Sequence, residues 1–187
     1  SETRTETTYD ENFLVTSITS FTNGQKTLEL CDYVYGDRTR VHKANTYMNG
    51  QCISSQVHTD SFIDDFYRNM SVSEITPATG NSPVQRNEFI YDDQGRIVGM
   101  KQYVDGVLQS EQFNYVWTPN SCEYESITHH PFQSTDKVSK LFSDENYVQN
   151  VCEIHITTMN GFKTETKTEY TYDENGKIIW ATEYYKQ

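Results

Sequence analysis

The chain has few of the residues from which helical cores are built. Among its 187 residues only 5 are Leu and 3 are Ala, whereas 23 are Thr and 14 are Tyr. Leu and Ala enter a helix at the lowest cost, whereas Thr, Tyr, Val and Ile fit the half-buried surface of a strand. The composition therefore argues against a helical bundle and predicts an all-β protein with a thin core.

Long apolar runs and positive charge are also scarce. No stretch approaches the ~18 apolar residues of a helix that spans a membrane. With 15 Lys and Arg against 27 Asp and Glu, the formal net charge is −12, and a chain this acidic repels phosphate groups. We therefore expect neither a membrane-spanning segment nor a nucleic-acid partner.

Motifs for catalysis and cofactor binding are missing. The sequence has no Gly-x-Ser-x-Gly element, no glycine-rich phosphate loop and no paired carboxylate pattern. The histidines lack the spacing of a metal-ligand set, and the cysteines form no Cys-x-x-Cys pair. We predict no catalytic residue, no metal site and no cofactor.

The cysteines leave two interpretations open. Cys31, Cys52, Cys122 and Cys152 permit two disulfides in an exported chain, or they are free thiols in a sheet. A hairpin turn at 36–39 would place Cys31 opposite Ala44. Cys52 would then lie two strands away from Cys31, at a lateral distance of about 9–10 Å. A disulfide requires Cα atoms within ~7 Å, so we predict no bridge between Cys31 and Cys52.

Turn signals are abundant along the chain. Asn-Gly or Asp-Gly occurs five times, at 23–24, 49–50, 105–106, 160–161 and 175–176. This dipeptide supplies the positive φ angles of a type I′ turn, and between β-prone runs it is a strong hairpin signal. The turn at 160–161 is expected to pair Met159 with Phe162. The sequence therefore predicts a series of antiparallel hairpins.

A second turn motif alternates with the first. Residues 89–97, Phe-Ile-Tyr-Asp-Asp-Gln-Gly-Arg-Ile, match residues 170–178, Tyr-Thr-Tyr-Asp-Glu-Asn-Gly-Lys-Ile. In each copy the Asp can accept hydrogen bonds from backbone N–H groups ahead of it, and the Gly can take left-handed geometry. The predicted structural turn residues are Asp92, Gly95, Asp173 and Gly176. Related positions recur at steps of about 26 residues, which indicates an array of hairpin units.

This second motif resembles the YD repeat of Rhs-type bacterial surface and toxin proteins. The chain is also similar in composition and turn pattern to secreted Bacteroidetes domains of unknown function that carry degenerate YD hairpins. Other copies in the chain are degenerate, since Phe13 stands in a glycine position and Gly36 in an aspartate position. The resemblance implies an antiparallel sheet, an extracytoplasmic location and glycan contact, and it implies no catalytic residue.

One segment departs from the hairpin pattern. Apolar residues at 62, 63, 66, 67 and 70 have helical spacing, which predicts a short helix near 62–70, followed by a loop at 76–83. The run 28–35 is apolar on both faces of its strand. We therefore expect a single domain over 1–187, a large antiparallel meander that forms a strongly curled sheet or half-barrel. The helix-plus-loop insertion at 61–83 would plug its concave side.

The N-terminal region bears on location. Residues 1–12 are polar and contain four Thr, as expected of a mature chain from which a targeting segment was removed, or of a trimmed cytosolic protein. The Thr-, Tyr- and Asn-rich, Lys-poor composition is typical of exported β proteins. We expect an extracytoplasmic location, in the periplasm or at the cell surface, and the removed segment is a candidate site for a lipid anchor.

Aromatic residues at equivalent repeat positions are the candidate ligand-binding residues. They are Tyr35, Tyr91, Trp117 and Tyr172. Stacked rings on a sheet can bind sugar rings or an extended apolar ligand. The alternative is a cross-strand aromatic ladder that replaces the missing Leu in the core.

Three functions stay open from the sequence. The first is a non-enzymatic, extracytoplasmic binding or surface-assembly module for a glycan or a protein. The second is a carrier that holds an apolar or lipid ligand in the concave face of the sheet. The third is a hydrolase that uses the loop of His129 and His130 with acidic partners.

Overall fold

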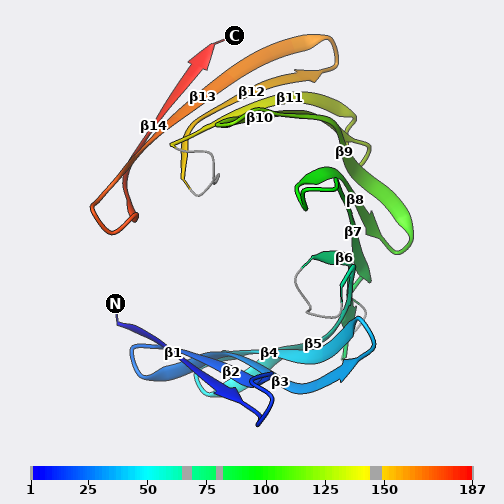
Figure 1. The fold of residues 1–187 in the computed structure, drawn as a ribbon, viewed down its shortest axis with the longest axis vertical. Coiled ribbons are helices and arrows are strands. Elements are labelled where there is room, and N and C mark those ends of the chain that lie inside the picture. The colour runs from blue at the N-terminus through cyan, green and yellow to red at the C-terminus, as the bar shows by residue number, and fades with distance from the viewer. Residues whose placement is uncertain (1, 65–68, 79–81, 144–148, 187) are drawn as a thin grey trace. The chain divides into compact units, whose positions relative to one another are not determined.

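The chain folds into fourteen β-strands (Figure 1). The computed structural model describes all residues except 1, 65–68, 79–81, 144–148 and 187. The strands are β1 (Thr3–Tyr9), β2 (Val15–Thr22), β3 (Gln25–Gly36), β4 (Thr39–Met48), β5 (Gln51–Phe62), β6 (Met70–Pro77), β7 (Gln85–Tyr91), β8 (Ile97–Val104), β9 (Val107–Trp117), β10 (Ser121–Thr128), β11 (Ser134–Phe142), β12 (Asn150–Met159), β13 (Phe162–Tyr172) and β14 (Ile178–Lys186).

The strands form one antiparallel sheet whose order follows the chain from β1 to β14. This confirms the predicted all-β meander. The predicted strong curl into a half-barrel is not shown: the strand order is linear, with β1 and β14 at its two ends, and the described residues of these two strands do not pair. In the part of the chain that the structure describes, no helix is long and apolar enough to cross a membrane.

The helix predicted at 62–70 is wrong. Phe62 ends β5 and Met70 begins β6, and these two residues are cross-strand partners. The N–H of Ile63 donates to the carbonyl of Asn69 (2.9 Å) and closes the connection between the strands. The apolar spacing that suggested a helix therefore comes from two strand ends that meet across a hairpin. Residues 65–68 lie outside the described part of the chain.

The Asn-Gly turns form as predicted at four of the five positions. Both residues have positive φ at 23–24, 49–50, 105–106 and 160–161, as a type I′ turn requires. The predicted pairing of Met159 with Phe162 is confirmed. At 175–176 only the glycine has positive φ, because this dipeptide belongs to the second kind of turn.

Bulges shift the register away from simple hairpin counting. Asp32 has a φ of 55° and lies in a bulge of β3, so that Cys31 pairs with Lys43 and not with Ala44 as predicted. An extra residue in one strand displaces every later pair by one position, which turn positions alone do not reveal. Cys31, Cys52, Cys122 and Cys152 are all free.

The chain divides into two compact units. Unit 1 comprises Ser1–Glu88 and Tyr103–Val107, and unit 2 comprises Phe89–Gln102 and Leu108–Gln187. Few side chains are buried in the described part of either unit. Those of unit 1 are His42, Asp60, Phe62 and Ser73, and those of unit 2 are Cys122 and Val138. The thin core expected from the composition is confirmed.

Unit 1 is organised around a buried carboxylate. Asp60 in β5 is 2% exposed and accepts hydrogen bonds from Arg40 Nη2 (2.7 Å) and Ser73 Oγ (2.9 Å). Arg40 and Ser73 are its direct partners in β4 and β6, so all three side chains share one face. On the same face the ring of His42 stacks on those of Tyr33 and His58. The core of unit 1 is therefore largely polar.

Candidate ligand-binding pocket

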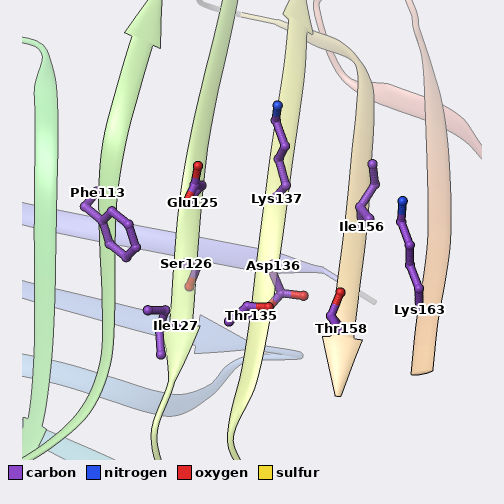
Figure 2. A pocket seen from close by; sticks show the side chains of 10 residues that line it. All are labelled: Phe113, Glu125, Ser126, Ile127, Thr135, Asp136, Lys137, Ile156, Thr158 and Lys163. Carbon is purple, nitrogen blue, oxygen red and sulfur yellow. The ribbon is translucent and has the colours of Figure 1, made fainter. Parts of the chain in front are cut away.

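Unit 2 carries two hollows lined by side chains of neighbouring strands. The two hollows share no lining residue, although Tyr124 and Glu125, which are adjacent in β10, line one each. One is a groove of about 310 Å³. Figure 2 shows its lining side chains on neighbouring strands, among them Phe113, Glu125 and Lys137. Because opposite charges alternate across this groove, it presents no single chemistry to a ligand.

Four of the nine side chains that line the second hollow are aromatic, and we call it the aromatic pocket. Its volume is about 380 Å³. It is lined by Ile97, Gln112, Tyr115, Trp117, Cys122, Tyr124, Lys140, Phe142 and Asn150. Burial raises the pKa of the Cys122 thiol to about 11, so this cysteine acts as a small apolar side chain in the pocket wall.

Three rings form a continuous stack in the aromatic pocket. Tyr115 lies between the other two, with its centroid 4.7 Å from that of Tyr124 and 6.3 Å from that of Trp117. The interplanar angles are 13° and 17°, so the rings are nearly parallel. Asn114 has a φ of 54° and lies where β9 and β10 shift register, so β9 has one extra residue opposite Tyr124. This bulge accounts for the close approach of Tyr115 to Tyr124.

The repeat aromatics also have a structural role that recurs. Trp117 Nε1 donates to the carbonyl of Ile97 (2.9 Å), the first residue of the preceding strand. The hydroxyls of Tyr35 and Tyr172 make the same contact with Val15 (2.9 Å) and Asn150 (2.8 Å). Each bond ties the end of one strand to the start of the strand before it. The structural and the ligand-binding interpretations of these aromatics therefore both remain open. Trp117 ties β9 to β8 and also lines the aromatic pocket.

The four predicted ligand-binding residues are not brought together. Trp117 lines the aromatic pocket, whereas Tyr91 and Tyr172 belong to unit 2 without lining it, and Tyr35 belongs to unit 1. The sequence singled out repeat positions, but a pocket also needs neighbours from strands between the repeats. The side chains of Tyr124, Lys140 and Asn150 come from such positions. A register for the β9–β10 hairpin would have placed Tyr124 near Trp117.

The predicted turn residues lie outside the pocket and form two matching loops. Asp92 Oδ1 accepts hydrogen bonds from the N–H groups of Gln94 and Arg96, each 2.9 Å long. Asp173 Oδ1 accepts from Asn175 and Lys177 at the same distance. Gly95 and Gly176 have φ angles of 77° and 76°. In each loop the carboxylate and the left-handed glycine act together to reverse the chain.

A charged network borders the aromatic pocket. Lys140 Nζ lies 3.3 Å from Glu153 Oε1 and 5.8 Å from the centroid of the Tyr124 ring. His155 Nε2 lies 2.7 Å from the same Glu153 oxygen, and Asn150 Nδ2 donates to Oε2 (2.8 Å). Burial, the largest single influence, raises the pKa of Glu153, but the charge of Lys140 and the hydrogen bonds from His155 and Lys140 together outweigh it, and the pKa is lowered. Glu153 is therefore ionised at neutral pH.

One polar atom of the pocket residues lacks a partner. The Nδ2 atom of Asn150 donates to Glu153, which fixes the amide with Oδ1 on its other side. Asn150 Oδ1 is buried and has no hydrogen-bond partner among the described residues. A buried acceptor without a donor costs about 1–3 kcal/mol. A ligand hydroxyl that reached this oxygen would recover that cost.

Four of the histidines have a carboxylate or a second imidazole as a neighbour. His129 Nε2 lies 3.2 Å from Glu111 Oε1, but in the described part of the chain no hydroxyl or thiol is hydrogen-bonded to this imidazole. His42 and His58 stack on each other, and burial lowers the pKa of both rings. Within the described residues, no group of three or more His, Cys, Asp or Glu side chains could hold a metal ion.

Comparisons with known proteins yield a distant likeness of fold. No protein-family model matches the chain, and no match is found among curated proteins. A porin-like protein from Bacteroides uniformis ATCC 8492 is similar in structure, with a TM-score of 0.49 and 10% sequence identity. The likeness covers 96% of this chain and 85% of that chain. At this identity and TM-score we infer nothing about function from it.

Proposed function

We propose that the protein is an extracytoplasmic, non-enzymatic binding module whose aromatic pocket holds a sugar ring. The observation that carries this proposal is the stack of Trp117, Tyr115 and Tyr124 in a pocket of about 380 Å³. Aromatic faces pack against the C–H groups of a sugar, and nearby polar groups bind its hydroxyls. The pocket supplies such groups through Gln112, Lys140 and Asn150.

A sugar fits the pocket better than the apolar ligand of a carrier. The volume lies within the range of small-molecule sites. An apolar ligand would supply no donor to Asn150 Oδ1, a buried acceptor that has none among the described residues. A hydroxylated ring would stack on the aromatic side chains and donate to the same oxygen.

The non-enzymatic assignment has support from the histidine environments. His129 and His155 each contact a carboxylate, which is one part of a nucleophilic or general-base site. Neither imidazole is hydrogen-bonded to a hydroxyl or thiol nucleophile in the described residues. The extracytoplasmic location rests on the Thr-, Tyr- and Asn-rich composition. Fractionation of cells that express the native gene product tests that part of the proposal.

A glycan array with matched variants tests the binding function. We expect the purified chain to bind a subset of neutral oligosaccharides, and Trp117→Ala to weaken binding at least tenfold. Tyr35→Ala is the matched control, because Tyr35 makes the same backbone hydrogen bond in unit 1 and lies outside the pocket. It should bind as the unaltered chain does.

A conservative variant separates loss of binding from loss of structure. Trp117→Phe keeps a ring in the pocket but removes the hydrogen bond from Nε1 to the carbonyl of Ile97. It should retain most of the affinity while lowering the stability of the β8–β9 pair. Equal loss of binding in Trp117→Ala and Tyr35→Ala, or binding to no sugar on the array, would overturn the proposal.

A further inference from the structure

We infer that the aromatic pocket selects neutral sugars and rejects uronic acids, because its lysine is already neutralised by Glu153. This inference rests on the proposed glycan-binding function and adds a specificity to it. A lysine beside stacked rings would ordinarily attract the carboxylate of an acidic sugar. Here Lys140 Nζ is held 3.3 Å from Glu153 Oε1. The cation is therefore not available to a second carboxylate.

The ion pair is partly buried. The side chains of Lys140 and Glu153 are 29% and 15% exposed. His155 and Asn150 hold the carboxylate from two further directions. Such a network fixes the position of the negative charge beside the pocket. A uronate placed next to Lys140 would face this charge, and like charges in a poorly hydrated site repel each other strongly.

A second cation near the rings is neutralised in the same way. The guanidinium of Arg96 lies 5.8 Å from the centroid of the Trp117 ring. Arg96 Nη2 is also 2.7 Å from Asp92 Oδ2, the carboxylate of the preceding turn. Each cation that approaches a ring of the stack therefore has its own carboxylate. The surroundings of the pocket carry no net positive charge from these two pairs.

The remaining polar groups of the pocket suit neutral hydroxyls. Asn150 Oδ1 is an acceptor with no donor among the described residues, which a sugar hydroxyl can satisfy and a carboxylate cannot. Gln112 and Lys140 offer further polar atoms at the pocket wall. The expected ligand is therefore a neutral hexose or pentose unit of an oligosaccharide.

Matched pairs of oligosaccharides test this specificity. Binding is measured for galactose and galacturonate oligomers, and for glucose and glucuronate oligomers, with the unaltered chain and with Glu153→Gln. We expect the unaltered chain to prefer the neutral member at least tenfold. Glu153→Gln should raise uronate affinity at least tenfold, because it frees Lys140, and Glu153→Gln combined with Lys140→Met should lose that gain. Glu123→Gln, an exposed change in β10 on the opposite face from Tyr124, is the control and should change neither affinity.

Methyl-esterified uronates give a test that needs no variant. Esterification removes the charge and keeps the ring, so these sugars should bind the unaltered chain as the neutral oligomers do. Equal affinity for neutral and uronate oligomers, or a uronate affinity that Glu153→Gln leaves unchanged, would overturn the inference and leave glycan binding intact. Binding to none of the oligomers would instead overturn the proposed function together with the inference.

Discussion

Among single residues of unit 1, Asp60 is a buried carboxylate whose hydrogen-bond partners stabilise the fold. Its carboxylate is 2% exposed and is held by Arg40 and Ser73. A buried ion that keeps its partners is tolerated, whereas removal of one partner leaves an uncompensated charge in a dry site. The stability of unit 1 should therefore depend far more on this ion pair than on the exposed pairs of the same unit.

Asp60→Ala should destabilise unit 1 by about 3 kcal/mol, since it leaves the Arg40 guanidinium without its carboxylate. Glu6→Ala is the control, because Glu6 and its partner Arg4 are 54% and 64% exposed in their side chains. That change should cost less than about 1 kcal/mol. Both values are measured by hydrogen exchange of amides in β4 and β5. Similar effects of the two variants would contradict a central role for Asp60.

His42 makes the stability of unit 1 depend on pH. Burial, with a smaller effect of His58, lowers its pKa from 6.5 to about 4 in the folded chain. Above pH 6.5 the imidazole is neutral whether folded or unfolded, so it contributes no pH dependence there. Between pH 6.5 and 4 the unfolded chain takes up a proton that the folded chain does not, so stability falls as the pH falls, by up to about 3 kcal/mol.

His42→Phe should reduce this pH dependence, because phenylalanine keeps a ring between Tyr33 and His58 but does not titrate; the part that comes from His58, whose pKa burial also lowers, should remain. The measurement is the free energy of opening of β4 and β5 amides from pH 7 to pH 4, by hydrogen exchange. Fluorescence would not serve, because both tryptophans, Trp117 and Trp180, lie in unit 2. An identical loss of stability in the two proteins over this interval would show that His42 is not the group responsible.

Among the elements, the Asp-initiated turns are the most regular feature of the chain. Asp10 Oδ1 accepts from the N–H groups of Asn12 (2.8 Å) and Leu14 (2.9 Å), as Asp92 and Asp173 do in their own turns. Phe13 has a φ of 62° where the other two turns have glycine. The first turn thus has the same geometry as the other two, although Phe13 adopts the left-handed conformation at a cost in free energy.

Phe13→Gly should stabilise the β1–β2 hairpin by about 1 kcal/mol. A left-handed conformation costs a residue with a Cβ about 1–2 kcal/mol and glycine much less. Little burial is lost, since Phe13 is 87% exposed. Phe13→Ala keeps the strain and should stay near the original stability. The measurement is hydrogen exchange of β1 and β2 amides, and a Phe13→Gly hairpin no more stable than the Phe13→Ala hairpin would refute the expected strain.

The elements also show what a sequence reveals and what it hides. An Asn-Gly dipeptide by itself predicts a turn with two positive φ angles, so the hairpins and the pairing of Met159 with Phe162 could be predicted. The helix at 62–70 could not be excluded from the sequence. Apolar residues that include Phe62 and Met70 recur there at helical intervals, yet these two residues pair across β5 and β6. Bulges such as that at Asp32 depend on long-range packing, so the register beyond them was not predictable.

At the scale of the whole molecule, each unit has a small core of its own kind. Unit 1 encloses a charged and histidine-rich cluster, whereas unit 2 encloses Cys122 and Val138 and carries the aromatic pocket. The composition predicted that rings would replace aliphatic side chains. It did not predict that Tyr124, Lys140 and Asn150 would meet Trp117, because these residues come from four strands whose pairing depends on several hairpins and a bulge.

The most direct test of sugar binding in the aromatic pocket uses the two tryptophans as reporters. Trp180→Phe leaves Trp117 as the one tryptophan of the chain, and Trp117→Phe leaves Trp180, which is 68% exposed in β14. Both variants are titrated with the neutral oligosaccharide that binds best on the array. Our account predicts a saturable change in fluorescence for Trp180→Phe and none for Trp117→Phe. A saturable change confined to Trp117→Phe, or absent from both while the sugar still binds, would contradict it.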